Sequence, residues 1–400
     1  MRKMNYLKKI ALTSLSILAI TGAVNAQSKV ESTFGKGISI MAKDSSFTMK
    51  FSTRFQSLMV NELVLQDDIS DQVIGTDLLI RRARLKFGGY AFNPKFGYKI
   101  ELGLSNRDHG SPIPETKNSA RIILDAALKY KITKNTTLWV GQTKLPGNRE
   151  RVISSQQLQF VDRSLLNSKY NIDRDMGLQL HNKHKVGNGV LIEKIAVSQG
   201  EGRNITVSNR GGFEYTGRVE WLPMGNFTGK GDYSGSDLKR EQKPKLSLAV
   251  TYDYHDNAAR QRANQGSFLS TTRTLSTVMA DLMFKYKGFS MMAEYADKNA
   301  PKGSVVSFES NGDVDEYFYT GKGLNVQAGY LFKSNWEVAG RYTQIDPSAV
   351  NQIDNIKMYT IGVSKYIVGH ALKMQTDVSL TQVGTNDAEL MHRIQFELAF

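Results

Sequence analysis

Basic side chains are concentrated in two stretches of the first half of the sequence. The first stretch covers the first two expected strands, where the alternation of side chains places Arg54, Arg82, Arg84 and Lys86 on one face with no acid between them on that face. Arginine suits phosphate and carboxylate groups because its planar guanidinium can hydrogen-bond two oxygens at once. Grouped cations in a narrow passage attract anions and repel other cations. The residues that we assign to such an anion-binding site are Arg54, Arg82, Arg84, Lys86, Arg149, Arg151 and Arg163.

These cations also have a structural interpretation. Over the whole chain the same strand face carries thirteen basic and eleven acidic residues, so its total charge is nearly balanced. Arg82 or Arg84 would then pair with Glu101 on a neighbouring strand instead of facing a solute. Arg81 has the opposite phase, which predicts that it faces outward, either toward lipid phosphates or as a snorkelling interfacial side chain.

Other chemistry is sparse in this sequence. The absence of Cys excludes disulfides, zinc-thiolate sites, iron–sulfur centres and a Cys nucleophile. His181 and His184 lie in a predicted turn without a third ligand, and a solvated turn explains them better than a metal site. No evident nucleophile accompanies His370 or His392, so we expect no enzymatic activity and no cofactor. Two groups of acidic residues could hold a divalent cation, but exposed acidic loops explain both of them better. The groups are Asp67, Asp68 and Asp71, and Asp313, Asp315 and Glu316.

The start of the chain predicts export. Four basic residues precede a short apolar stretch at 10–20, and Val24-Asn25-Ala26 offers small residues for signal-peptidase cleavage before Gln27. The stretch is too short for a membrane-spanning helix. We therefore predict a signal peptide at 1–26. Export removes nucleic acid as a partner, although the formal net charge of +14 would otherwise favour one.

Alternation of apolar and polar residues continues along the rest of the chain. Most of the alternating segments have ten to fourteen residues, well above the length usual in soluble sheets and sufficient for tilted strands to cross a membrane. We expect sixteen strands, at 47–60, 78–91, 96–105, 121–130, 136–145, 175–184, 190–199, 213–222, 245–254, 275–286, 288–297, 323–332, 335–344, 356–367, 371–383 and 390–400.

The expected connections alternate between long and short. Long loops on one side and tight turns on the other are typical of an outer-membrane barrel. The longest expected loop, 146–174, is the third on the extracellular side. The connection 223–244 is an exception, because it should be a short periplasmic turn but has 22 residues.

The fold class that follows is all-β: a transmembrane antiparallel β-barrel of about 16 strands with a long third extracellular loop. Residues 27–46 would be an N-terminal periplasmic lead-in and 47–400 the barrel. Alternation up to the terminal Phe400 is similar to the signal by which such barrels reach their insertion machinery. Outer-membrane lipid would surround the wall. A secreted β-sandwich binding protein is the soluble alternative, and it would rarely need sixteen long strands.

Several motifs resemble one known family. They are Arg81-Arg82-Ala83-Arg84-Leu85, Gly141-Gln142-Thr143-Lys144-Leu145-Pro146, Phe160-Val161-Asp162-Arg163-Ser164 and Asp173-Arg174-Asp175-Met176-Gly177. Together they are similar to the phosphate-selective porin O and P family in its Bacteroidetes form. The resemblance implies a 16-stranded trimeric porin that passes small anions and has a folded-in third loop. This sequence departs from the family at Gly147-Asn148-Arg149-Glu150, where Phe-Gly and an acid usually follow the proline.

The function expected from the sequence is passive, anion-preferring diffusion of small solutes such as phosphate across the outer membrane by a homotrimer. A non-selective diffusion porin is the nearest alternative, and an outer-membrane barrel enzyme is a more distant one.

Overall fold

The computed structural model describes residues 29–65, 74–109, 113–116 and 119–400. The predicted signal peptide at 1–26 and the acids Asp67, Asp68 and Asp71 lie outside these residues. Among the described residues, no helix is long and apolar enough to cross a bilayer.

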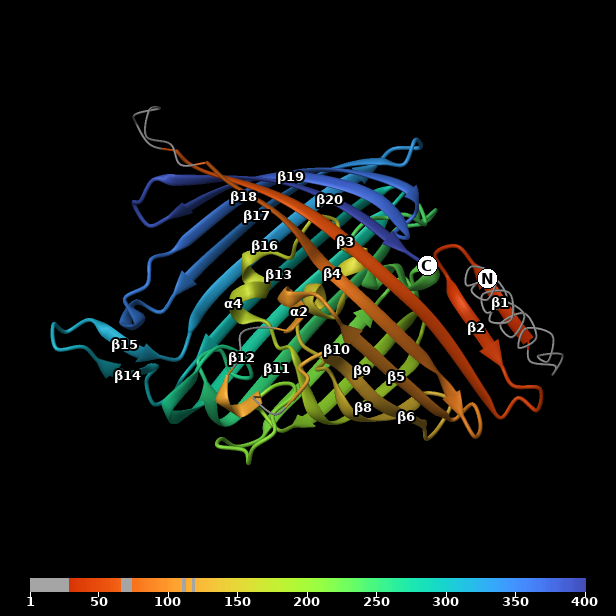
Figure 1. Cartoon of the computed structure of the whole chain (residues 1–400), viewed down its shortest axis with the longest axis horizontal. Helices are drawn as coiled ribbons and strands as arrows, with labels where there is room; N and C mark the ends of the chain where they lie inside the picture. Colours follow the sequence, from red (N-terminus) through yellow and green to blue (C-terminus); the bar gives the residue numbers. More distant parts are fainter. Residues whose placement is uncertain (1–28, 66–73, 110–112, 117–118) are drawn as a thin grey trace, which may run out of the picture.

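Sixteen long strands of the described chain form one closed antiparallel sheet, in which each strand pairs with its neighbour in the sequence and the last, β20, pairs with the first, β3. The strands tilt strongly across the wall (Figure 1). Their bounds are β3 Phe47–Leu65, β4 Ile74–Ala91, β5 Phe96–Gly103, β6 Ile123–Lys131, β7 Thr136–Lys144, β8 Arg174–Val186, β9 Gly189–Ser198, β10 Glu214–Leu222, β11 Lys245–Arg260, β12 Phe268–Tyr286, β13 Phe289–Asn299, β16 Gly321–Leu331, β17 Trp336–Pro347, β18 Ile356–Val368, β19 Leu372–Val383 and β20 Ala388–Ala399.

This closed barrel confirms the predicted all-β class and the predicted antiparallel barrel of sixteen strands. Its side-chain distribution is the reverse of that in a soluble protein, as β18 shows. Tyr359 and Ile361 point outward and are 52% and 68% exposed, whereas Thr360 between them is 2% exposed and faces the interior. Apolar residues outside and polar residues inside suit a wall in contact with lipid.

Two short strands precede the barrel, β1 Lys29–Thr33 and β2 Gly37–Met41. They form a hairpin, and β2 pairs with the start of β3, where Ile38 lies opposite Phe51. The hairpin and the C-terminus lie at the same end of the barrel (Figure 1). The predicted lead-in therefore contains regular structure that extends the sheet beyond the end of β20.

The connections differ in length at the two ends of the barrel. At one end, which we call the short-turn rim, they include 92–95, 132–135, 187–188, 287–288, 332–335 and 369–371. At the other, the long-loop rim, they contain the short elements α2 Asn106–His109, η2 Pro114–Thr116 and η5 Ala349–Asn351, and the hairpin β14 Val305–Phe308 with β15 Val314–Tyr317. The prediction that His181 and His184 lie in a turn is wrong, because β8 continues to Val186 and the chain turns at Gly187, whose φ is +57°.

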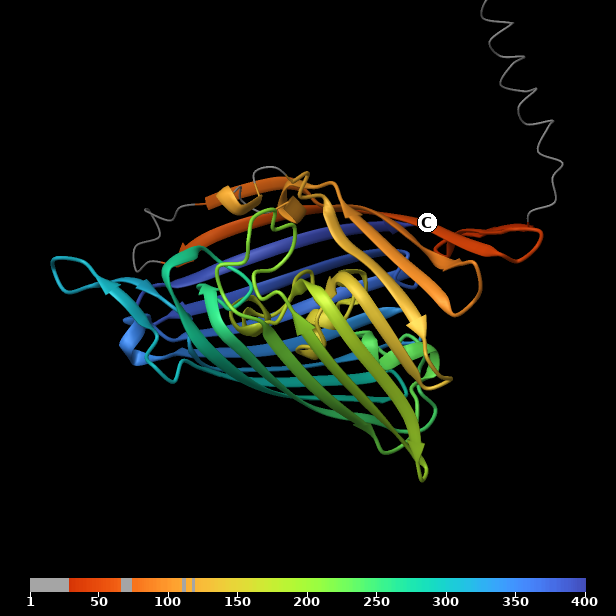
Figure 2. The ribbon, with the colours of Figure 1, turned by 90° about the horizontal axis from the view of Figure 1, so that it is seen from below.

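The connection between β7 and β8, residues 145–173, folds into the barrel and contains α3 Arg149–Val152, η3 Ser155–Gln157 and α4 Leu165–Tyr170 (Figure 2). Its middle reaches the far wall, where the amide of Gln159 donates to Glu337 at 2.9 Å. Its end is fixed by apolar packing of Leu166 and Tyr170 against the wall residue Ile345. We call this segment the inner loop.

The long connection 223–244 also folds inward, from the short-turn rim, and includes η4 Thr228–Tyr233. The backbone N–H of Gly235 donates to the carbonyl of Gln157 in the inner loop at 2.8 Å. A Cβ at Gly235 would lie 2.7 Å from the nitrogen of Gln159, so the close approach requires glycine. The ammonium of Lys285 donates to the carbonyls of Ser234 and Ser236. The two inward segments thus brace each other inside the barrel.

Candidate functional site

A cavity of about 380 Å³ lies between the inner loop and the wall formed by β4, β6, β7, β8 and β20. Ten basic and three acidic side chains line it. The basic residues are Arg81, Arg82, Arg84, Arg107, Lys144, Arg151, Arg163, Arg174, Arg203 and Arg393, and the acids are Asp108, Asp162 and Asp173.

Asp162 of the inner loop is shared by three arginines. It accepts hydrogen bonds from Arg81 at 2.7 Å and Arg82 at 3.2 Å, and Arg393 lies 3.8 Å away. Burial alone would raise the pKa of Asp162, but the three guanidinium groups outweigh it and hold the pKa below the ordinary aspartate value. Asp162 is therefore ionised at neutral pH. The stability that it contributes is present above the ordinary aspartate pKa and is lost as the pH falls through the lower folded value.

The prediction that Arg81 faces outward is wrong. Gln56 pairs with Arg82 and the next residue, Ser57, pairs with Ile80, so Arg81 is the extra residue of a β-bulge. The bulge breaks the two-residue period, and both Arg81 and Arg82 reach Asp162 inside the barrel.

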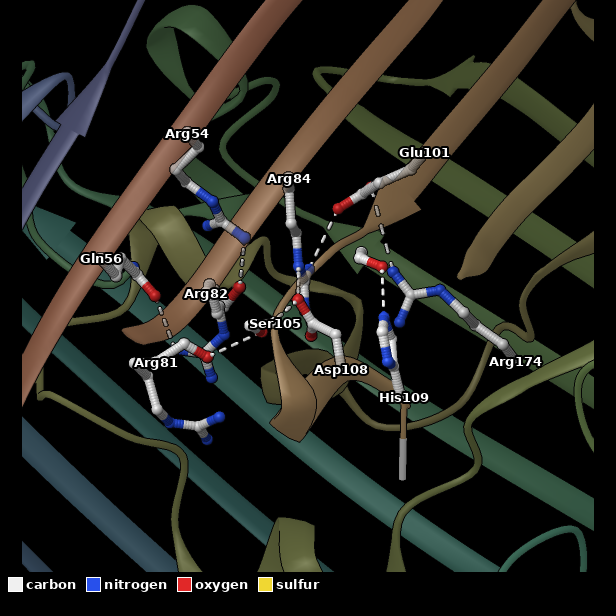
Figure 3. A network of polar contacts seen from close by, with 12 residues as sticks. Arg54, Gln56, Arg81, Arg82, Arg84, Glu101, Ser105, Asp108, His109 and Arg174 are labelled. Carbon is white, nitrogen blue, oxygen red and sulfur yellow. Dashed lines mark hydrogen bonds and ion pairs between the residues drawn. The ribbon is translucent and has the colours of Figure 1, made fainter. Parts of the chain in front are cut away.

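Arg84 is held between two carboxylates (Figure 3). It donates to Asp108 of α2 at 2.9 Å and to Glu101 of β5 at 3.0 Å. The Glu101 contact is the cross-strand pair that the sequence offered as a structural alternative. Ser105 also donates to Asp108, at 3.2 Å, so α2 is drawn against the wall beside the cavity.

Four cations of the cavity have no ion pair with a carboxylate among the described residues: Arg107, Lys144, Arg163 and Arg203. Lys144 donates to the carbonyl of Arg151 at 2.6 Å, and Arg163 donates to the carbonyls of Glu150 at 2.9 Å and Ile153 at 2.7 Å. Neutral carbonyl groups accept hydrogen bonds from these two side chains but do not neutralise their positive charges. Burial, followed by the neighbouring Arg151 and Arg82, lowers the pKa of Arg163. An anion in the cavity would relieve that repulsion.

The structure separates the seven residues that the sequence grouped. Arg82, Arg84, Arg151 and Arg163 line the cavity. Lys86 lies beyond it, 3.6 Å from Glu101. Arg54 is buried and donates to Ser155 of the inner loop at 2.9 Å.

Arg149 is fully buried on the opposite side of the inner loop. It binds Asp281 at 2.7 Å and Glu220 at 3.3 Å, and donates to the carbonyl of Asp232 at 2.9 Å. This guanidinium joins the inner loop, the wall and the inward segment 223–244. It has no surface left for a solute.

Two neighbouring cavities continue the basic lining. One of about 500 Å³ toward the long-loop rim shares Arg174 and Arg203 with the central cavity. Another, of about 190 Å³, shares Arg84 and Lys144 and extends past Lys86 toward the short-turn rim. The three cavities are linked by shared lining residues, and Arg149 and its ion-pair partners line none of them.

Sequence reasoning did not identify Arg107 and Arg203 as site residues. They come from two different loops of the long-loop rim, where no periodic signal relates them to the strands. Lys144 stood in a family-like motif, but nothing in the motif showed that its charge would remain unpaired.

The histidine pair has a structural role in the wall. His181 lies on β8 and stacks on Trp139, with ring centroids 4.6 Å apart. Among the described residues, no group of three or more His, Asp and Glu side chains is arranged to hold a metal ion.

The sequence predicts that this site binds anions, and on that prediction Asp162→Asn should tighten phosphate binding in the cavity, because one negative charge is removed and three arginines lose their shared partner. We expect the phosphate concentration that half-blocks chloride current to fall about tenfold, which corresponds to about 1.4 kcal/mol. Planar-bilayer titration measures it. Asp313→Asn on the exposed β14–β15 hairpin is the matched control. An equal half-blocking concentration in the Asp162 variant and wild type would contradict the assignment.

Three solved structures share the barrel architecture. The outer membrane channel DcaP of Acinetobacter baumannii aligns with a TM-score of 0.52 at 13% identity, covering 90% of this chain and 99% of its own. OmpT of Vibrio cholerae gives a TM-score of 0.51 at 9% identity in its trimer form and 0.53 at 10% identity in a loop L8 deletion mutant. Each OmpT alignment covers 89% of this chain and 100% of that one. These low identities show the fold alone.

The sequence profile of one family, described as phosphate-selective porin O and P, matches residues 64–400. A search of curated proteins gives no significant match. The profile spans the barrel from the end of β3 onward, including the inner loop and every cavity-lining residue. The chain is therefore an outer-membrane porin that belongs to the phosphate-selective porin O and P family.

Proposed function

We propose that this porin provides passive, anion-preferring diffusion of small solutes such as phosphate. The observation that carries the proposal is the composition of the central cavity, where ten basic side chains face three acids and four of the cations form no ion pair with a carboxylate in the described part of the chain. Such a fixed excess of positive charge in a confined passage concentrates anions and repels cations. Arginine forks supply paired donors to phosphate oxygens.

The path would run through the three basic cavities, because the central one shares lining residues with each of the other two. Solutes would enter at the long-loop rim, which we place on the extracellular side, and leave at the short-turn rim in the periplasm. Diffusion down a gradient needs neither a cofactor nor an energy source. Binding must stay weak enough for the solute to leave.

The test is the zero-current potential of the refolded protein in a planar bilayer under a potassium chloride gradient, followed by addition of phosphate. We expect a potential signed for anions and a chloride current that phosphate blocks. A potential near zero or signed for cations would overturn anion preference and leave a general diffusion porin. A failure to form channels would bring back the enzyme alternative.

We also propose that the chain assembles as a homotrimer and reaches the membrane through the barrel insertion machinery by its last strand. The trimer form of the similarly folded Vibrio cholerae protein supports the first proposal. Light scattering with detergent correction measures the copy number, and a monomeric mass in mild detergent would contradict it.

A further inference from the structure

The cavity of about 500 Å³ toward the long-loop rim, which we call the vestibule, is lined differently from the central cavity. The two cavities adjoin, because both are lined by Asp173, Arg174 and Arg203. Charged side chains make up most of the central lining, whereas in the vestibule neutral polar side chains are as numerous as charged ones. The neutral side chains, apart from His109, are Thr116, Asn204, Gln261, Asn264, Gln265 and Ser267.

The vestibule offers hydrogen-bond acceptors as well as donors. The side chains of Gln261 and Ser267 form no hydrogen bond with any other residue that the structure describes, and both are at least partly exposed. The amide nitrogen of Gln265 donates to Oδ1 of Asn171 at 2.6 Å, which leaves the amide oxygen of Gln265 as an acceptor. Amide and hydroxyl groups of this loop are therefore available to a solute.

Such acceptors have no use for bare phosphate. The phosphate dianion is mainly an acceptor of hydrogen bonds, and guanidinium groups supply the donors that it needs. A hydroxyl group both donates and accepts, so an amide or a serine side chain can pair with it in either direction. The lining of the vestibule therefore fits an anion whose organic part carries hydroxyl groups.

Three arginines make the vestibule positive. Within the described chain, Arg203, Arg260 and Arg262 form no ion pair with a carboxylate. Arg260 donates to the backbone carbonyl of Glu201 at 2.7 Å, and Arg262 donates to the backbone carbonyl of Ser168 at 2.5 Å. Carbonyl oxygens fix the positions of these guanidinium groups without cancelling their charges, so an anion is attracted into the vestibule as well as into the central cavity.

The loop between β11 and β12 has a fixed backbone. The N–H of Gln261 donates to the carbonyl of Ser267 at 3.0 Å, and the N–H of Arg262 donates to the carbonyl of Gln265 at 2.9 Å. The N–H of Tyr319 donates to the carbonyl of Gln261 at 2.8 Å, which ties this loop to its neighbour. Because the backbone is held in this way, the side chains of Gln261 and Ser267 can bind a solute without ordering the loop.

The volume of the two cavities also exceeds what inorganic phosphate requires. Cavities of about 300–1,000 Å³ typically hold organic ligands. Ile113 is the one apolar side chain among the described residues that line the vestibule, so an apolar organic group would bury little surface there. Size thus favours an organic anion, and the polar lining favours a hydroxylated one.

We propose that the vestibule and the central cavity together bind phosphate monoesters of hydroxylated carbon chains, the class to which sugar phosphates belong. The phosphate group would lie among the arginines of the central cavity, and the hydroxyl groups would lie beside Gln261 and Ser267. This inference rests on the anion preference proposed above and adds the class of substrate.

Block of the chloride current in planar bilayers tests the proposal, at about pH 8, where phosphate monoesters are dianions. Glucose 6-phosphate and phenyl phosphate carry the same charge on a six-membered ring, but only the first has hydroxyl groups. We expect a half-blocking concentration about tenfold lower for glucose 6-phosphate, which is the effect of about one or two hydrogen bonds.

Inorganic phosphate is the third compound and separates the two proposals. If inorganic phosphate blocks the current and the two esters block equally, the assigned substrate class is wrong and the anion preference stands. If none of the three compounds blocks the current, the proposed function fails as well.

Gln261→Leu with Ser267→Ala should make the half-blocking concentrations of the two esters equal, because the hydroxyl partners are removed. Gln382→Leu with Ser310→Ala is the matched control, since both residues lie at the long-loop rim outside the three basic cavities, and it should keep the tenfold difference. The heat-dependent gel shift of a closed barrel checks the folding of each variant. A tenfold difference that survives Gln261→Leu with Ser267→Ala would overturn the assignment of hydroxyl binding to the vestibule.

Discussion

Replacing Arg82 and Arg163 together by glutamine should remove most of the anion preference that we propose for the channel. Both guanidinium groups line the central cavity, and Arg163 has no carboxylate partner there among the described residues. Two fewer charges in a confined passage should lower the chloride-to-potassium permeability ratio by about tenfold or more, or ~1.4 kcal/mol. The zero-current potential under a salt gradient measures this ratio, and phosphate block should weaken in parallel.

The matched control removes two charges elsewhere. Lys302→Gln with Lys357→Gln changes exposed lysines of the long-loop rim outside the cavity, so the permeability ratio should stay close to that of wild type. If both double variants shift the potential equally, the net charge of the protein and not the cavity determines selectivity. The gel shift should show that both barrels are closed.

Arg149→Met should destabilise the protein and widen the channel. Removal of one partner from a buried ion pair typically costs about 3–5 kcal/mol, because the remaining charges stay buried. Asp281 and Glu220 would lose this partner, and the carbonyl of Asp232 would lose its donor. Urea unfolding in detergent micelles should show a lower midpoint. Single-channel conductance should rise, because the inner loop loses one of its anchors to the wall.

Lys322→Met supplies the comparison for Arg149. Its ion pair with Asp297 spans 3.7 Å, and the lysine side chain is 62% exposed. Exposed pairs contribute little, so neither the urea midpoint nor the conductance should change. Arg218 also binds Asp281 at 2.6 Å and Glu220 at 3.1 Å. A normal urea midpoint for Arg149→Met would mean that Arg218 compensates these carboxylates without Arg149.

The wall of this protein could be predicted because every strand repeats one rule. Each strand has lipid on one face and water or polar contacts on the other, so apolar and polar residues must alternate along it. Sixteen segments, such as 356–367, show this alternation in their local sequence alone. The rule fails where one residue is inserted. At Arg81 a bulge shifts the phase, and nothing in the local residue types announces it.

The site was only partly predictable for a different reason. The alternation of side chains along β4 places Arg82 and Arg84 on the interior face, but it does not predict which interior cations form an ion pair with a carboxylate. This pairing depends on the two inward segments, 145–173 and 223–244, whose sequences show no periodic pattern of apolar and polar residues. Arg149 and Arg163 lie fourteen residues apart in one loop, yet one is enclosed by Asp281 and Glu220 and the other faces the cavity.

The pairing of β20 with β3 also affects how the protein is made. Gln56 and Glu397 hydrogen-bond at 2.7 Å across a sequence separation of 341 residues. Until β20 is available, the edge of β3 from Arg54 to Leu65 has no partner strand, and an unpaired edge is a template for wrong partners. The first barrel strand, β3, can therefore complete its pairing only after the last strand, β20, has been exported. Contacts between residues so far apart in the sequence form slowly. We expect the chain to need protection from aggregation throughout its passage across the periplasm, with closure as the final step of its folding.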